Sequence, residues 1–134
     1  MLKQYTALSI VAPNAERIAK KIKTLEVRSW QPEMLPLKDL IIVENQNFLL
    51  SDGDEDVGFA VALVDIESVH PWRSDEVDAA CATYWAEGYF AWVIGNIRPI
   101  DPPIQIIAKR KLYLLELTLD NLSYRYLPQL VPQP

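Results

Sequence analysis

Apolar and polar positions alternate along much of the chain, and this period of two predicts several short β-strands. The stretches that alternate in this way, or that form short apolar runs bounded by turn residues, are 5–11, 24–30, 40–43, 48–50, 57–69, 89–94 and 104–119. Within 24–30, Leu25 and Val27 are expected on one side of the strand. Glu26 and Arg28 are then expected together on the other side.

Apolar residues also recur at helical spacing in two places. The first stripe comprises Ala15, Ile18, Ala19 and Ile22. It predicts a short helix after Pro13, and Asn14 is the expected N-cap because its side chain can accept a backbone N–H.

A second helix is predicted from Ser74 to about Glu87, with Gly88 as its C-terminal stop. Its buried face would comprise Val77, Ala80, Cys81, Tyr84 and Trp85.

Several short strands with two to three short helices, and no βαβ rhythm, predict an α+β fold. We expect a strongly curved mixed or antiparallel sheet, closed into a small β-barrel. The prolines in 99–103 are expected to form a loop between the last two strands. The 134 residues are expected to be one domain with a core at about 5–119, and three prolines after Leu127 predict an irregular tail at about 120–134.

Composition excludes some classes of site. Cys81 is the only cysteine and His70 the only histidine, so neither an internal disulfide nor a Cys/His metal cluster is expected. The longest apolar run, Phe59 to Val64, is far shorter than the roughly 20 residues of a membrane helix. We therefore expect a cytoplasmic protein with no metal, no cofactor and no membrane partner, and the oligomeric state stays open.

The formal net charge of −5 argues against strong non-specific binding to nucleic acid, which requires an excess of Lys and Arg. The basic residues nevertheless gather in two places, which are Arg17 to Arg28 and Lys109 to Lys111. A locally basic face on an acidic protein is therefore compatible with the sequence.

One short segment groups side chains that can bind or react. Lys23, Glu26 and Arg28 lie within six residues, and the last two are about 7 Å apart along one strand face. They can form a solvated ion pair, which is the commoner arrangement, or bind one ligand together. His70, in the sequence H-P-W, is interpreted as a turn histidine packed beside Pro71 and Trp72 rather than as a general base.

Aromatic side chains can stack on the bases of single-stranded RNA. We predict that Trp92 belongs to the core and that Trp30 and Tyr89 lie at the rim of a binding site. Lys109, with the two basic residues that follow it, is either a solvated turn or a lip that contacts phosphate.

Four stretches together resemble the ASCH domain, the activating-signal-cointegrator homology domain. The first is A-L-S-I-V-A-P-N-A-E-R-I-A-K-K-I-K-T-L-E-V-R-S-W (7–30), with the K-x-x-E-x-R signature. The others are V-G-F-A-V-A-L-V-D-I-E-S-V-H-P-W (57–72), Y-F-A-W-V-I-G-N-I-R-P-I-D-P-P-I (89–104) and K-L-Y-L-L-E-L (111–117).

This resemblance implies a PUA-like β-barrel with a cleft that is lined by Lys23, Glu26 and Arg28. It also implies a role in RNA binding or RNA-linked chemistry. The chain departs from the family at Lys21 and Ala108, where glycine is usual, and the extra bulk there is expected to alter the cleft entrance.

The resemblance leaves two functions open. One is a module that binds RNA or a nucleotide or nucleoside through Lys23, Glu26, Arg28, Trp30, Tyr89 and Lys109. The alternative is a hydrolase of RNA or of a modified nucleoside at the same cleft, a ribonuclease or an amidohydrolase, with Lys23 and Glu26 as catalytic residues.

Amidohydrolase activity is disfavoured by one difference from the small ASCH-like enzymes. They carry threonine three residues after the lysine, where this chain has Glu26, and Thr24 is expected to point to the opposite side of the strand. A protein-interaction module is a third option, which a large exposed apolar patch without a polar cleft would favour.

Overall fold

The structure is a computed structural model that describes residues 3–120 and 123–126. Its strands are β1 (Lys3–Val11), β2 (Leu25–Arg28), β3 (Leu37–Asn45), β4 (Glu55–Pro71), β5 (Phe90–Lys109), β6 (Leu112–Asp120) and β7 (Ser123–Tyr126). They form one sheet in the order β2-β5-β4-β3-β1-β6-β7. The β1–β3 pair is parallel and the other pairs are antiparallel. The chain is therefore mostly β, with one α-helix, α1 (Asn14–Ala19), and one 3-10 turn, η1 (Ser74–Glu76), in its described part.

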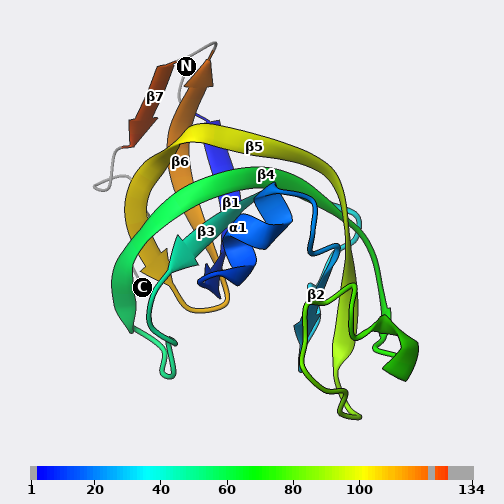
Figure 1. Ribbon diagram of the computed structural model, residues 1–134. Coiled ribbons are helices and arrows are strands. Elements are labelled where there is room, and N and C mark those ends of the chain that lie inside the picture. Colours follow the sequence, from blue (N-terminus) through cyan, green and yellow to red (C-terminus); the bar gives the residue numbers. More distant parts are fainter. Residues whose placement is uncertain (1–2, 121–122, 127–134) are drawn as a thin grey trace.

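Strands β4 and β5 are 17 and 20 residues long and arch over the rest of the molecule (Figure 1). Their pairing is interrupted by three register shifts, between Ala60 and Ala62, Leu63 and Asp65, and Ile66 and Ser68. Such irregularities bend a sheet and increase its twist. The two strands therefore belong to both halves of a strongly curved sheet.

The sheet is curved, as predicted, but the prediction of a closed barrel is wrong. Among the described residues, β2 pairs only with β5 at one end of the sheet and β7 pairs only with β6 at the other. The two end strands are short, with four residues each. In the described ranges no backbone pairing joins β2 to β7. The barrel is therefore open on the side where β2 lies.

Alternation along the central strands fills two core clusters on opposite sides of the sheet. Ile41 and Val43 of β3 belong to the first cluster, whereas Leu40 and Ile42 belong to the second. Helix α1 covers the second cluster with Ala15 and Ile18, under the arch of β4 and β5 (Figure 1). A third, smaller cluster comprises Leu25, Trp72, Ala80 and Ala91. It joins β2 and β5 to the segment that follows β4.

A buried carboxylate sits at the bend. One oxygen of Asp65 accepts hydrogen bonds from the backbone N–H of Asp39 at 3.0 Å and from Arg98 at 2.9 Å. The other accepts from the side-chain amide of Asn96 at 3.1 Å. Asp39 and Asn96 both have positive φ, at 56° and 48°, which costs energy for residues other than glycine. The carboxylate thus connects β3, β4 and β5 where their backbones depart from regular pairing.

The predicted second helix is wrong. Only Ser74–Glu76 is helical, as the 3-10 turn η1, because backbone groups of the following residues bond outside the segment. The carbonyl of Ala79 accepts from the backbone N–H groups of Thr24 and Leu25, and the carbonyl of Ala80 accepts from Lys23. Cys81 has φ of 56°, a left-handed conformation that ends a helix. It is partly buried rather than a core residue.

The first helix is close to its prediction but differs in two details. The N-cap residue is Pro13, which makes no side-chain capping hydrogen bond, so Asn14 is not the N-cap that was expected. The side chain of Asn14 accepts from Arg17 instead, and Glu44 accepts from the backbone N–H of Glu16 at 3.0 Å. Ile22 is 60% exposed because α1 ends at Ala19, before the predicted stripe is complete.

Three other strand boundaries differ from their predictions. Residues 48–50 are not in a strand, and the backbone N–H of Leu50 donates to the side chain of Asp54 at 3.0 Å instead. The predicted loop 99–103 lies inside β5, where its prolines occupy an irregular stretch of the ladder. Ser123–Tyr126 pairs with β6, although irregular structure was expected there, because its tyrosines favour strands. Residues 127–134 of the predicted tail lie outside the described residues.

No helix in the described ranges 3–120 and 123–126 has the length and apolar character needed to cross a membrane.

The Asp65 network generates a stability prediction. Burial alone would raise the pKa of Asp65, but hydrogen bonds from Asp39 and Asn96 and the charges of Arg98 and Lys38 lower it below its usual 3.8. The unfolded chain therefore binds more protons, and the stabilisation is present above about pH 4 and lost as the pH falls further.

We expect Asp65→Asn to lower the free energy of unfolding by about 1–3 kcal/mol at pH 7, because an amide cannot replace the charge. Urea denaturation of both proteins between about pH 3 and pH 7 measures this difference. The deficit of the variant should shrink toward pH 3. A deficit that is the same at all pH values would contradict an ionised Asp65 at the bend.

Candidate functional site

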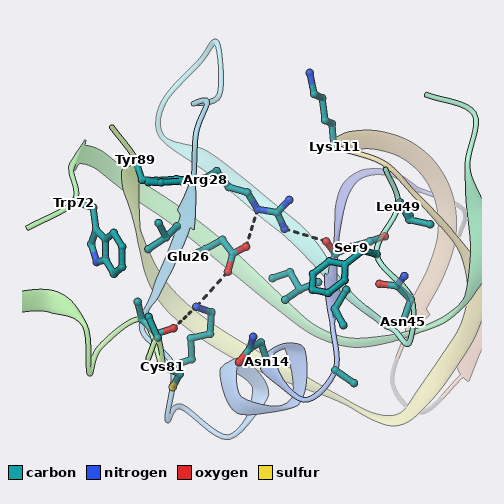
Figure 2. Close-up of a pocket in the computed structure, with 18 of the residues that line it drawn as sticks. Ser9, Asn14, Glu26, Arg28, Asn45, Leu49, Trp72, Cys81, Tyr89 and Lys111 are labelled. Carbon is teal, nitrogen blue, oxygen red and sulfur yellow. Dashed lines mark hydrogen bonds and ion pairs between the residues drawn. The ribbon is translucent and has the colours of Figure 1, made fainter. Parts of the chain in front are cut away.

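A cleft of about 650 Å³ opens between the two halves of the curved sheet. Its floor comes from β2 and from the end of β1, and Figure 2 shows Glu26 and Arg28 in its middle. Trp72 and Tyr89 lie on one side of this pair, and Leu49 and Asn45 lie on the other. The size lies within the range of about 300–1,000 Å³ that is usual for small-molecule sites.

The three signature side chains form one connected chain of ion pairs. The ammonium of Lys23 lies 3.4 Å from one carboxylate oxygen of Glu26. The other oxygen of Glu26 accepts from Nε of Arg28 at 2.7 Å. Lys23 also donates to the carbonyl of Ala80 at 2.5 Å, and Arg28 donates to the carbonyl of Ser9 at 3.1 Å. The residues that the sequence grouped are therefore together at the floor of the cleft.

The burial of these side chains separates their roles. Lys23 and Glu26 are 5% and 8% exposed, whereas Arg28 is 24% exposed. Two nitrogens of the guanidinium, Nε and Nη2, are bonded to Glu26 and Ser9. Within the described part of the chain, the third nitrogen, Nη1, donates no hydrogen bond. Arg28 is therefore the signature residue that can reach a ligand.

The cleft is basic although the protein is acidic. Its charged lining residues are five cations and one carboxylate, namely Lys23, Arg28, Lys109, Arg110, Lys111 and Glu26. Two of the cations are also paired with carboxylates, Lys109 at 3.7 Å with Glu55, the first residue of β4, and Arg110 at 2.8 Å with Asp52 in the loop before that strand. The cleft therefore presents excess positive charge to a ligand.

The structure separates the aromatic candidates. Tyr89 lines the cleft, together with Lys109. Trp30 does not belong to the lining in the described chain, and its ring packs edge-on against Trp92 with centroids 4.9 Å apart. Trp92 is fully buried, so its prediction as a core residue is confirmed. Trp30 supports the rim indirectly, because the ammonium of Lys111 lies 5.9 Å from the centre of its ring.

His70 lies outside the lining of the cleft. Its Nε2 is 2.9 Å from both carboxylate oxygens of Glu76. Glu76 also accepts from the backbone N–H of Arg73 at 3.0 Å. This histidine therefore ties the turn after β4 to the strand, which agrees with a structural role.

The two departures from the ASCH pattern have different structural explanations. Lys21 has φ of 64°, and a left-handed conformation is the one for which glycine is favoured. Ala108 is fully buried in the first core cluster and faces Gly58. It is not among the described residues of the cleft wall, so the expectation that its methyl group alters the entrance is wrong.

Sequence reasoning missed part of the cleft wall. The missed residues include Ser9, Asn45, Phe48, Cys81 and Tyr84. They come from the end of β1 and from loops whose path depends on tertiary contacts, so no local pattern identified them. The described residues contain no group of three or more His, Cys, Asp or Glu side chains placed to hold a metal ion.

The buried ion pairs generate a second prediction. We expect Glu26→Gln to lower the free energy of unfolding by roughly 2–4 kcal/mol, because Lys23 would stay buried without a counter-ion. Urea denaturation at neutral pH measures the change. Glu16→Gln is the control. It breaks the exposed ion pair between Glu16 of α1 and Lys20 and should change the free energy of unfolding little. Equal stability of the Glu26 variant and the wild type would contradict a structural role for the pair.

Comparison with known proteins identifies the family. No curated protein matched significantly. The family model of the ASCH domain matches residues 8–104, which include all of the first three of the four stretches that resemble it except Ala7. This match spans most of the chain and contains Lys23, Glu26 and Arg28. The chain therefore belongs to the ASCH domain family, whose fold is PUA-like.

Proposed function

We propose that the cleft binds a nucleotide unit of single-stranded RNA and that Arg28 contacts it directly. ASCH domains are generally thought to bind RNA. The observation that carries the proposal is the chain of ion pairs from Lys23 through Glu26 to Arg28, which holds one guanidinium at the floor of a basic cleft.

The geometry of Arg28 suits a phosphate or the acceptor edge of a base. A guanidinium has five N–H groups in a planar fork, and this fork binds such acceptors in pairs. Glu26 and the Ser9 carbonyl fix the plane of the fork, so little conformational entropy is lost on binding. In this arrangement Lys23 and Glu26 position Arg28 rather than contact the ligand.

The same contacts favour binding over hydrolysis at this cleft. A general base needs a carboxylate that is free to take a proton, but both oxygens of Glu26 are engaged by cations. Lys23 is buried and is bonded to Glu26 and Ala80. A hydrolase that used these two groups would have to break the contacts that build the floor.

Binding of a single-stranded RNA octamer tests the proposal directly. We expect Arg28→Ala to weaken it by roughly 10- to 100-fold, because charged hydrogen bonds to the ligand are lost. Arg28→Lys should recover only part of the affinity, since an ammonium lacks the planar fork. Arg73→Ala is the matched control, because Arg73 is exposed outside the cleft wall of the described chain.

Fluorescence anisotropy gives the affinities, thermal unfolding verifies that each variant folds, and mass spectrometry detects any product. Unchanged affinity in Arg28→Ala would overturn the proposal. A new product from wild-type protein would make the cleft an active site instead.

The rim cations predict the salt dependence of binding. Removal of one phosphate contact lowers the slope of log affinity against log salt concentration by roughly 0.7 for a single strand. We expect this change in Lys111→Ala, because Lys111 lines the cleft. Lys20→Ala should keep the wild-type slope, because Lys20 is exposed just after the end of α1 and lies outside the described cleft wall. Equal slopes for Lys111→Ala and the wild type would exclude a phosphate contact there.

A further inference from the structure

Phe48 is an apolar ring that the structure places in solvent at the cleft. It follows β3, lines the same cleft as Arg28, and is 76% exposed. Its neighbour Leu49 is partly buried against the first core cluster. A single exposed apolar side chain is common on protein surfaces, so the position of Phe48 in the lining of a basic cleft is what makes it a candidate ligand contact.

The loop fixes the backbone on both sides of this ring. Before Phe48, one carboxylate oxygen of Asp56 accepts from the backbone N–H groups of Gln46 and Asn47, at 3.3 and 3.1 Å. After it, Asp54 accepts from the backbone N–H groups of Leu50 and Ser51, at 3.0 and 2.9 Å.

Asn45 anchors the loop to the rest of the cleft. It is buried, its side chain donates to the carbonyl of Asn47 at 2.6 Å, and its own carbonyl accepts from Ala12. The ring is therefore carried by a pre-organised loop.

The neighbours of Phe48 define the chemistry of its ligand. The cleft that Phe48 lines is also lined by Lys109, Arg110 and Lys111, which can meet phosphates. Arg110 is paired at 2.8 Å with Asp52, in the loop that follows Phe48. An exposed ring beside backbone-binding cations is the usual arrangement for single-stranded nucleic acid, because every base has a face that can stack. A mononucleotide held at Arg28 has one base and does not need Phe48. A strand of two or more nucleotides has a further base, which can stack on this ring.

We infer that Phe48 is a second subsite, a platform on which the base of a neighbouring nucleotide stacks while Arg28 holds the first. This inference rests on the proposed function and extends it from a nucleotide to a strand of at least two nucleotides. It makes affinity depend on strand length.

The experiment compares 5′-AMP with an oligoadenylate octamer on wild-type protein and on four variants, Arg28→Ala and the three that follow. Stacking on an aromatic side chain changes affinity by roughly 5- to 100-fold per base. We expect Phe48→Ala to weaken octamer binding by that factor and to leave AMP binding unchanged. Phe48→Trp should keep the octamer affinity, because the indole also stacks. Phe59→Ala is the control, since Phe59 is a partly exposed phenylalanine on β4 outside the described cleft wall.

The outcomes separate this inference from the function on which it rests. If Phe48→Ala binds the octamer as the wild type does while Arg28→Ala does not, the platform is rejected and the proposed function stands. If both variants keep the wild-type affinity, or if the wild type binds neither probe, both proposals fail. If Phe48→Ala keeps its octamer affinity but turns a wild-type dimer into a monomer in sedimentation, the ring belongs to a contact between copies, and the platform is rejected.

Discussion

The bend in β4 and β5 is the constraint on which the rest of this structure depends. In the sheet, three strands separate β2 from β1, so a flat sheet would hold them about 19 Å apart at the usual spacing of strands. Arg28 of β2 nevertheless donates to the Ser9 carbonyl of β1 at 3.1 Å. Only a sheet that curls back toward itself allows this contact. Asp65 holds the curl because it bonds to β3 and β5 where regular pairing fails.

The three signature residues, Lys23, Glu26 and Arg28, differ in burial and therefore in role. Each cation next to Glu26 compensates part of the cost of removing that carboxylate from water, so the carboxylate and Lys23 can lie inside while Arg28 reaches the cleft. The same contacts tie β2 to the segment after η1 and to β1. A substitution of Lys23 or Glu26 can therefore change the stability of the fold as well as ligand binding. Arg28 is the most exposed of the three, so its substitution is the most direct test of ligand binding.

Local patterns predicted most of the strands and placed Glu26 and Arg28 on one strand face, because alternation and residue spacing are short-range properties. They failed where a distant contact decides the outcome. The segment after η1 has helical spacing, but its carbonyls bind Lys23, Thr24 and Leu25 instead. Trp30 is only two residues after Arg28, yet its ring packs against Trp92 and does not line the cleft in the described chain. Phe48 was placed in a strand, because nothing near it in the sequence shows that carboxylates would hold its loop.

The ion pair between Arg110 and Asp52 has a consequence for any anion that enters the cleft. Asp52 is 92% exposed, and its carboxylate binds Arg110 as a phosphate of the ligand would. A phosphate that binds Arg110 therefore competes with Asp52. When a nucleic-acid strand binds Arg110, its phosphate replaces the carboxylate of Asp52 and not only mobile salt ions. Fewer counter-ions are released than the number of rim cations implies, so the affinity depends less steeply on salt than a count of those cations suggests.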